Sequence, residues 1–517
     1  MSDKRAWREW CVRHPDLVHG ALFFAFFVAA SVAGMYDMPL AADNQHYFFI
    51  AERAASGVPP HVSQLDPKNA LGMLVTAGAI VAGRFVGVDD LLASRVVSVL
   101  AGALAIALVG PLARRLTGST IAAWVASIAM LSLNRFVLMA AMGSQPKVFL
   151  VLFVVASLLL VSLRRPALAG LAAGAAFLCW QPAAALVAAG ALALLLGGAG
   201  KRAAASFVAA AAAPFVAYEA YFLYHGALVE QLTQAYLFPL QFMESAPTKL
   251  RPVLRRAAWV LAVSEGLTLW SLVPLLFVVW LVLLWSRSWR RSPDPAYSMT
   301  KRSDRIYFAL ASHAAFVNCL LSYQGFPDRF FLDPFMAISS GWLIAGGLAR
   351  FEAAPVAVKT RRGVAALSLV ALSLLAALGH WDYRYLRGLH AQRKLGEAVG
   401  KLLDAGFGVY AVGCTHLLAF NHVDNFTPYG FFFRGVAESL QVGSGGRGYR
   451  PLRDGKMPDV ILISRGTYLR EQPWFEAEYA RAKRDDFGNQ SVQVWLRVRR
   501  GSGGVSRDIP ALSADSP

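Results

Sequence analysis

A group of ionisable residues follows directly after the first long apolar run of the chain. Residues 17–35 are apolar enough to cross a bilayer, and the polar stretch AADNQHYFFIAERAASGVPPHVSQLDPKNALG then occupies residues 41–72. The side chains of this stretch that could do chemistry are Asp43, His46, Glu52, Asp66 and Lys68. A carboxylate can take the proton of an attacking hydroxyl group, and an ammonium can neutralise a phosphate. These residue types therefore predict a site for a phosphate-bearing substrate at a membrane surface.

The composition is that of a polytopic membrane protein. Of the 517 residues, 56% are hydrophobic and only 16% are charged, against roughly 25% charged residues in soluble domains. Apolar runs long enough to span the bilayer recur from residue 17 to residue 380. The formal charge of +18 comes from basic residues placed in pairs between these runs. Because the basic residues form no continuous stripe, we expect no nucleic-acid partner.

The segment at residues 69–87 decides the topology, because it is apolar but short and is interrupted by glycines and Arg84. If it lies along the interface as a juxtamembrane helix, every strongly basic loop faces the cytoplasm, as the positive-inside rule requires. These loops contain Arg114-Arg115, Arg164-Arg165, Lys201-Arg202, residues 286–305 and residues 350–362. We therefore predict about eleven transmembrane helices and an external C-terminus. The predicted external loops are 36–90, 136–147, 225–260 and 322–329.

Asp43 and Tyr47 are spaced i, i+4, so a short helix would place them on one face. Asp66-Pro67-Lys68 comes just before the juxtamembrane helix, which would hold a carboxylate and a lysine at the membrane surface. A simpler role for Asp43 is the N-cap of the helix, since Asp is a favoured capping residue. The pattern alone leaves both roles open.

The first external loop resembles that of the GT-C superfamily of membrane glycosyltransferases. The similarity is greatest to the branch with the protein O-mannosyltransferases and the lipid A aminoarabinose transferase. The shared features follow one another along the chain: a first span, an Asp-x-x-x-Tyr segment, an Ala-rich helix, a lysine before a juxtamembrane helix, and a span that ends in RRLTG. The resemblance implies that Asp43 is the catalytic base, that Tyr47 accompanies it, and that Lys68 meets the donor phosphate. The chain differs from the family pattern at Asn44 and Asn69, where relatives have an acidic residue and a proline.

Other external residues could complete a donor site. The second loop offers Gln145 and Lys147 where relatives often have an aspartate, and Arg329 follows Asp328 at a span end. We expect Lys147 and Arg329 to assist Lys68. His46 and Asp66 are further candidates for substrate binding.

A metal site is a weaker expectation. His46 and His61 could bind a divalent ion with Glu52 or Asp66, but no HExxH pattern is present. Hydrogen-bonding roles are favoured for both histidines. We therefore predict no definite cofactor, and a divalent metal stays an alternative.

Three parts of the chain are expected. Residues 1–380 form the transmembrane domain, residues 381–500 a small periplasmic α/β domain, and residues 501–517 a tail with the composition of a disordered segment. An amphipathic helix after residue 380 precedes three segments that look like strands, GVYAVG, PDVILIS and SVQVWLRVR.

The resemblance and the outer charges together imply an inverting glycosyltransferase of a bacterial inner membrane. It would transfer a sugar from a polyprenyl-phosphate donor to a hydroxyl of a lipid, glycan or protein acceptor on the periplasmic side. The alternatives are a lipid-linked glycan ligase or polymerase, and a polytopic transporter or flippase. A transporter is expected to carry ionisable residues at mid-span and internal repeats. Glu219 and Glu265 lie near apolar runs, but no repeat is seen.

Overall fold

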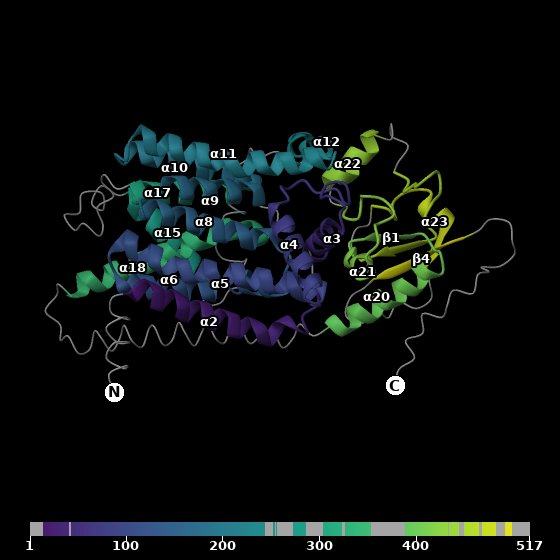
Figure 1. Cartoon of the computed structure of the whole chain (residues 1–517), viewed down its shortest axis with the longest axis horizontal. Helices are drawn as coiled ribbons and strands as arrows, with labels where there is room; N and C mark the ends of the chain where they lie inside the picture. Colours follow the sequence, from purple (N-terminus) through teal and green to yellow (C-terminus); the bar gives the residue numbers. More distant parts are fainter. Residues whose placement is uncertain are drawn as a thin grey trace.

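The structure of the chain is a computed structural model in which a long helical bundle carries a small mixed sheet at one end (Figure 1). It describes residues 14–40, 43–242, 252–253, 255, 272–285, 303–322, 326–352, 388–432, 434–443, 449–464, 468–481 and 492–498. The main bundle helices are α2 (Pro15–Met35), α5 (Asp90–Thr117), α6 (Thr120–Ser132), α7 (Asn134–Met142), α8 (Pro146–Ser162), α9 (Pro166–Cys179), α10 (Ala184–Leu196), α11 (Lys201–Tyr224), α15 (Leu272–Trp285), α17 (Ser303–Ser322) and α18 (Asp333–Glu352).

Three described helices are each long and apolar enough to cross a membrane, and the bent pair α6–α7 makes a fourth if it is counted as one span. The three are α2, α5 and α11. Five shorter apolar helices lie beside them, including α8 and α9. The number of eleven spans stays a prediction, because the last apolar run, at 364–380, lies outside the described residues.

Glycines bring bundle helices into close contact. A Cβ atom on Gly170 would lie 2.0 Å from the carbonyl oxygen of Phe207, and one on Gly174 would lie 2.2 Å from that of Ala211. These contacts join α9 to α11. Small residues let helix backbones approach in this way within a bilayer, where van der Waals packing replaces the hydrophobic effect. The Ala- and Gly-rich composition of the apolar runs thus has a direct packing role.

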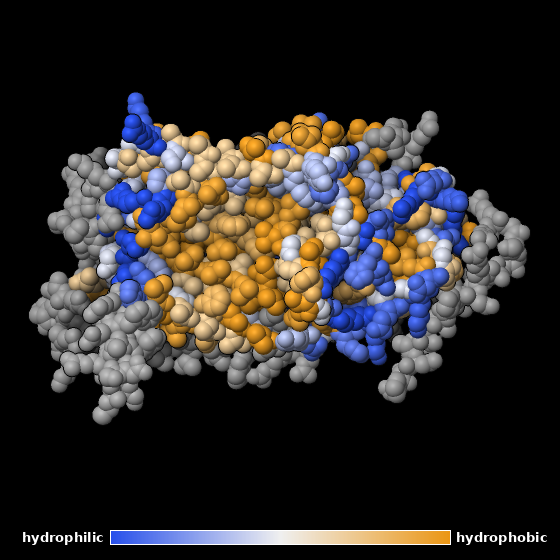
Figure 2. Space-filling model, viewed as in Figure 1, coloured by the Kyte–Doolittle hydropathy of each residue, from blue (hydrophilic) through white to orange (hydrophobic). Residues whose placement is uncertain are grey.

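The basic helix ends meet at one end of the bundle. Arg114 pairs with Asp16 at 2.7 Å, and Arg305 donates a hydrogen bond to the carbonyl of Leu116 at 3.0 Å. Arg164 reaches Ser303 at 3.4 Å, so the ends of α2, α5, α8 and α17 lie together. Figure 2 shows an apolar region across the middle of the bundle, with hydrophilic residues toward both ends.

Helices α3 (Asp43–Ala55) and α4 (Leu71–Phe85) lie at the opposite end of the bundle, next to the sheet (Figure 1). Both ends of α4 are at this end. Gly72 packs against Pro146 at the start of α8, and Gly83 packs against Ala93 at the start of α5. Helix α4 therefore does not run the length of the bundle, although its sequence is as apolar as that of a span.

The C-terminal residues form a four-stranded sheet in the order β1-β2-β4-β3. β1 and β2 are parallel, and the other neighbours are antiparallel. Each of the three segments expected as strands contains one, and β3 was not expected. The elements are α20 (Leu389–Asp404), β1 (Val409–Val412), α21 (His416–Ala419), α22 (Arg434–Gly443), β2 (Val460–Ile463), α23 (Phe475–Glu478), β3 (Tyr479–Arg481) and β4 (Gln493–Arg497). The expected tail at 501–517 lies outside the described residues.

Backbone hydrogen bonds fasten this C-terminal part to the segments around α3. The amide of Leu65 donates to the carbonyl of Pro428 at 2.8 Å, and the amide of Leu389 donates to that of Asp37 at 3.2 Å. Helix α21 packs directly on α3. The first loop is thus held between the bundle and the C-terminal part.

Candidate active site

Asp43 and Tyr47 lie one turn apart in α3, as their spacing predicted. Asp43 is the first residue of the helix and is half-buried, whereas Tyr47 is buried. Among the described residues, the Asp43 carboxylate has no hydrogen-bond partner. In this part of the structure, therefore, no capping bond from the Asp43 side chain is observed.

Lys68 joins the loop before α4 to this face of α3. Its Nζ atom donates a hydrogen bond to the Tyr47 hydroxyl at 2.5 Å. Burial disfavours the charge of Lys68, but Tyr47 and the carboxylates of Asp43, Asp66 and Asp328 outweigh this cost and raise the pKa of Lys68. Lys68 is therefore a permanent ammonium within the electrostatic range of Asp43.

Asp66 organises the turn that presents Lys68. Its Oδ1 atom accepts a hydrogen bond from the Lys68 amide at 2.8 Å, and its Oδ2 atom lies 3.0 Å from His46 Nε2. Burial favours the neutral form of Asp66, yet the hydrogen bond from His46 and the nearby positive charges lower the pKa overall. His46 Nδ1 is in turn 2.7 Å from the side-chain nitrogen of Gln64. Both His46 nitrogens and both Asp66 oxygens thus already have protein partners.

The two other cations predicted for the donor site, Lys147 and Arg329, each pair with a carboxylate. Lys147, at the start of α8, pairs with Asp328 and lies 4.2 Å from the ring centroid of Trp180. Arg329 is 1% exposed and pairs with Asp333 at 2.9 Å. Among the site cations that the structure describes, Lys68 differs from these two because it makes no ion pair.

Asn44 and Gln145, two positions at which the chain departs from the family pattern, form hydrogen bonds between α3 and the turn before α8. Asn44 donates a hydrogen bond from its side-chain nitrogen to the carbonyl of Gly143 at 2.6 Å, and Gln145 reaches the Asn44 side-chain oxygen at 3.4 Å. An amide at residue 44 can donate this bond, which a carboxylate cannot. Asn44 therefore holds α3 against the turn between α7 and α8.

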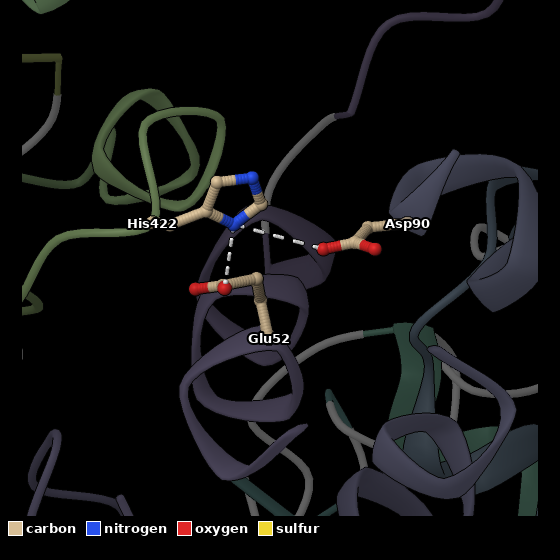
Figure 3. A group of neighbouring side chains, drawn as sticks. All are labelled: Glu52, Asp90 and His422. Atoms are coloured by element: carbon tan, nitrogen blue, oxygen red, sulfur yellow. Dashed lines mark hydrogen bonds and ion pairs between the residues drawn. The ribbon is translucent and has the colours of Figure 1, made fainter. Parts of the chain in front are cut away.

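The expected metal ligands are not gathered in one place. His46 and Asp66 are together, whereas Glu52 meets His422 of the C-terminal part at 2.9 Å (Figure 3). Asp90 completes this group of possible ligands, and Arg84 already bonds Glu52 at 2.8 Å and Asp90 at 2.6 Å. The Arg84 guanidinium contacts both carboxylates and offsets part of their negative charge, so we interpret this group as an ionic contact between α3 and the C-terminal part.

Two glutamines at this end of the bundle were not anticipated from the sequence. Gln181 lies between α9 and α10, and Gln234 follows α12 (Leu228–Leu232). Both donate hydrogen bonds to backbone carbonyls of the loop that carries Lys68. A polar residue between two apolar runs, as in CWQPA, was the available signal for Gln181.

The comparisons with known proteins concern the family and the fold. The model of the DolP-mannose mannosyltransferase family matches residues 60–218. No curated protein matches the chain in sequence. Two crystal structures of ArnT from Cupriavidus metallidurans are similar in fold. The one bound to undecaprenyl phosphate has a TM-score of 0.57 and 15% identity, and the similarity covers 93% of this chain and 98% of that chain.

The apo structure of the same ArnT has a TM-score of 0.58 and 16% identity, with 95% of this chain and 98% of that chain covered. The similarity of fold thus extends over the bundle and the C-terminal part together, whereas the family match runs from the loop before α4 to α11. The resemblance read from residues 41–72 is thereby confirmed, and the chain has the fold of the GT-C membrane glycosyltransferases.

Proposed function

We propose that this protein is an inverting glycosyltransferase that uses a polyprenyl-phosphate sugar as its donor. The observation that carries the proposal is the Asp43 carboxylate, which has no hydrogen-bond partner in the described part of the chain and lies within electrostatic range of the Lys68 ammonium. Both are at the end of the bundle opposite the basic helix ends. A base and a fixed positive charge on one side of a membrane bundle suit the attack of a hydroxyl group on a phosphate-activated sugar.

In the proposed reaction, Asp43 accepts the proton of the acceptor hydroxyl as its oxygen bonds to the anomeric carbon. The bond between that carbon and the phosphate oxygen breaks, and its electron pair stays on the phosphate. Lys68 stabilises the negative charge that develops there, an effect that is large where water is excluded. Attack opposite the leaving phosphate inverts the configuration of the sugar.

Lys68 is assigned to the phosphate ahead of Lys147 and Arg329. Both of those residues already face a carboxylate, Asp328 and Asp333 respectively. Each would have to exchange that partner to bind a phosphate, whereas Lys68 would only give up or share its bond to Tyr47. Lys147 and Arg329 are therefore proposed as secondary contributors.

The related proteins support a lipid-phosphate donor. The matched family is named for mannosyl transfer from DolP-mannose, and one of the ArnT structures holds undecaprenyl phosphate. We further propose that the site faces the periplasm of a bacterial inner membrane, because the positive-inside rule places the opposite, basic end in the cytoplasm. The sugar transferred and the acceptor are separate questions for assay.

The experiment is a transfer assay in proteoliposomes with radiolabelled polyprenyl-phosphate sugars and a panel of lipid, glycan and protein acceptors. We expect labelled product from the wild-type protein and far less from Asp43→Asn. Uptake of label into the vesicle lumen without covalent transfer would favour the transporter alternative. Extension of an acceptor by whole lipid-linked glycans would favour the ligase or polymerase.

A further inference from the structure

Two glutamine side chains make four hydrogen bonds, three with the loop at residues 59–70, here called the Lys68 loop, and one with Ala235. Gln234 donates from Nε2 to the carbonyl of His61 at 2.7 Å, and its Oε1 accepts from the amide of Asp66 at 3.2 Å. Gln181 donates from Nε2 to the carbonyl of Pro67 at 2.8 Å and to that of Ala235 at 2.9 Å. The bonds to the loop thus hold His61, Asp66 and Pro67, which precede Lys68 in the chain.

Gln234 lies in a short π-helical turn, Thr233–Leu237, between α12 and α13 (Phe238–Phe242). Single π-helical turns are rare and are often found at functional sites. The side chain of Gln234 bridges both ends of the segment from His61 to Asp66. Because His61 has a φ of 68°, an unfavourable conformation for a residue with a Cβ, its carbonyl needs a partner that holds it in place.

Gln181 connects the same π-helical turn to the residue directly before Lys68. Its side-chain nitrogen reaches both Pro67 and Ala235, so the two segments cannot separate without the loss of one of these bonds. Asp66 then sets the amide of Lys68 through its Oδ1 atom. The path from the π-helical turn to Lys68 is thus a continuous series of hydrogen bonds.

We propose that Gln181 and Gln234 are positioning residues for the donor, and that they act by holding Lys68 where its ammonium meets the donor phosphate. Neither side chain is assigned a contact with the donor itself. The proposal rests on the proposed function, in which Lys68 binds that phosphate. A lysine is a point charge, so its contribution falls as the distance to the phosphate grows.

The test uses the full-length protein and undecaprenyl phosphate as the binding probe. Gln181→Met and Gln234→Met keep the length of the side chain and remove its hydrogen bonds. We expect each substitution to weaken binding of undecaprenyl phosphate about tenfold, the size of one or two lost hydrogen bonds. In the transfer assay, KM for the donor should rise by a similar factor, while kcat changes much less.

The decisive comparison repeats both substitutions in a Lys68→Ala background. If the glutamines act through Lys68, they cause no further loss of affinity there, because residues that act on one contact are not additive. A purely structural role would weaken binding equally in both backgrounds and would overturn the proposal. The two glutamines lie on different elements, and each can be tested alone. If one of the two variants fails to fold, the other still provides the comparison between the wild-type and Lys68→Ala backgrounds.

Gln231→Met is the matched control. Gln231 belongs to the neighbouring helix α12 and is fully buried; its side chain interacts with Tyr218 and Tyr236, and among the described residues it makes no hydrogen bond to the Lys68 loop. We expect the Gln231→Met variant to bind undecaprenyl phosphate with the same affinity as the wild-type protein. Wild-type affinity in Gln181→Met and Gln234→Met, with Lys68→Ala impaired, would overturn the positioning role alone. Wild-type affinity in Lys68→Ala would instead overturn the donor site on which it rests.

Discussion

The Lys68 ammonium lies 2.5 Å from the Tyr47 hydroxyl, one helical turn after Asp43 in α3. This contact brings together two segments that are 21 residues apart in the sequence. Among the site residues that the structure describes, Lys68 is the cation without an ion pair and Asp43 is the carboxylate without a hydrogen bond, and Asp43 is close enough to help raise the pKa of Lys68. The predictions below follow from this pairing and from the contacts that surround it.

Asp43→Asn should slow transfer severely while the protein stays folded. Asparagine has nearly the same size and caps a helix about as well as aspartate, but it cannot accept a proton at neutral pH. The loss of a general base typically lowers the rate by about 10²–10⁴. The measurement is the initial rate of sugar transfer, alongside the melting temperature of the purified protein. Near-wild-type turnover would remove Asp43 from catalysis.

Lys147→Met should lower stability more than it lowers donor affinity. The substitution removes the ammonium that pairs with the buried carboxylate of Asp328, and breaking a buried ion pair typically costs about 3–5 kcal/mol. Thermal unfolding in detergent measures the effect. The double variant Lys147→Met, Asp328→Leu should regain most of the lost stability. A normal melting temperature in the single variant, combined with poor donor binding, would instead make Lys147 a direct phosphate contact.

A reporter that is active only in the periplasm should be silent when fused after Arg291 and active when fused after residue 400. The expectation follows from the basic helix ends, which meet at one end of the bundle, and from the C-terminal sheet at the other. The opposite pattern of reporter activity would reverse the orientation of the protein. It would also place Asp43 and Lys68 on the cytoplasmic side.

The stability of the protein should fall as the pH drops below 6.5, in part because of His416. This residue is fully buried in the C-terminal part, and burial lowers its pKa to about 3. The unfolded chain binds a proton on this histidine below about pH 6.5, whereas the folded chain does not until about pH 3. The contribution of His416 is therefore full above pH 6.5 and is lost progressively as the pH falls.

At pH 5 the expected loss from His416 is about 2 kcal/mol relative to pH 7. Melting temperatures across this range measure it, and His416→Met is the control because it cannot titrate. The variant should show a smaller decline between pH 7 and pH 5 than the wild-type protein. Equal declines in the two proteins would mean that His416 contributes nothing to the pH dependence.

The contacts around α3 separate what could be predicted from what could not. The i, i+4 spacing of Asp43 and Tyr47 predicted their common face, because neighbouring turns of a helix follow from local geometry. The partner of Glu52 could not be predicted in the same way. His422 is 370 residues away in the chain, and only the docking of the C-terminal part on α3 brings the two together.

The sequence by itself determined the membrane class, the apolar helices, the strands β1, β2 and β4, and the resemblance that singled out Asp43, Tyr47 and Lys68. These properties depend on composition, periodicity and short spacings, which are local. The tertiary structure decided which charges are free and which are paired: Lys147 with Asp328, Arg329 with Asp333, and Lys68 with the Tyr47 hydroxyl. It also decided that Gln181 and Gln234 hold the Lys68 loop, because a side chain finds its partner through the packing of elements that are distant in the sequence.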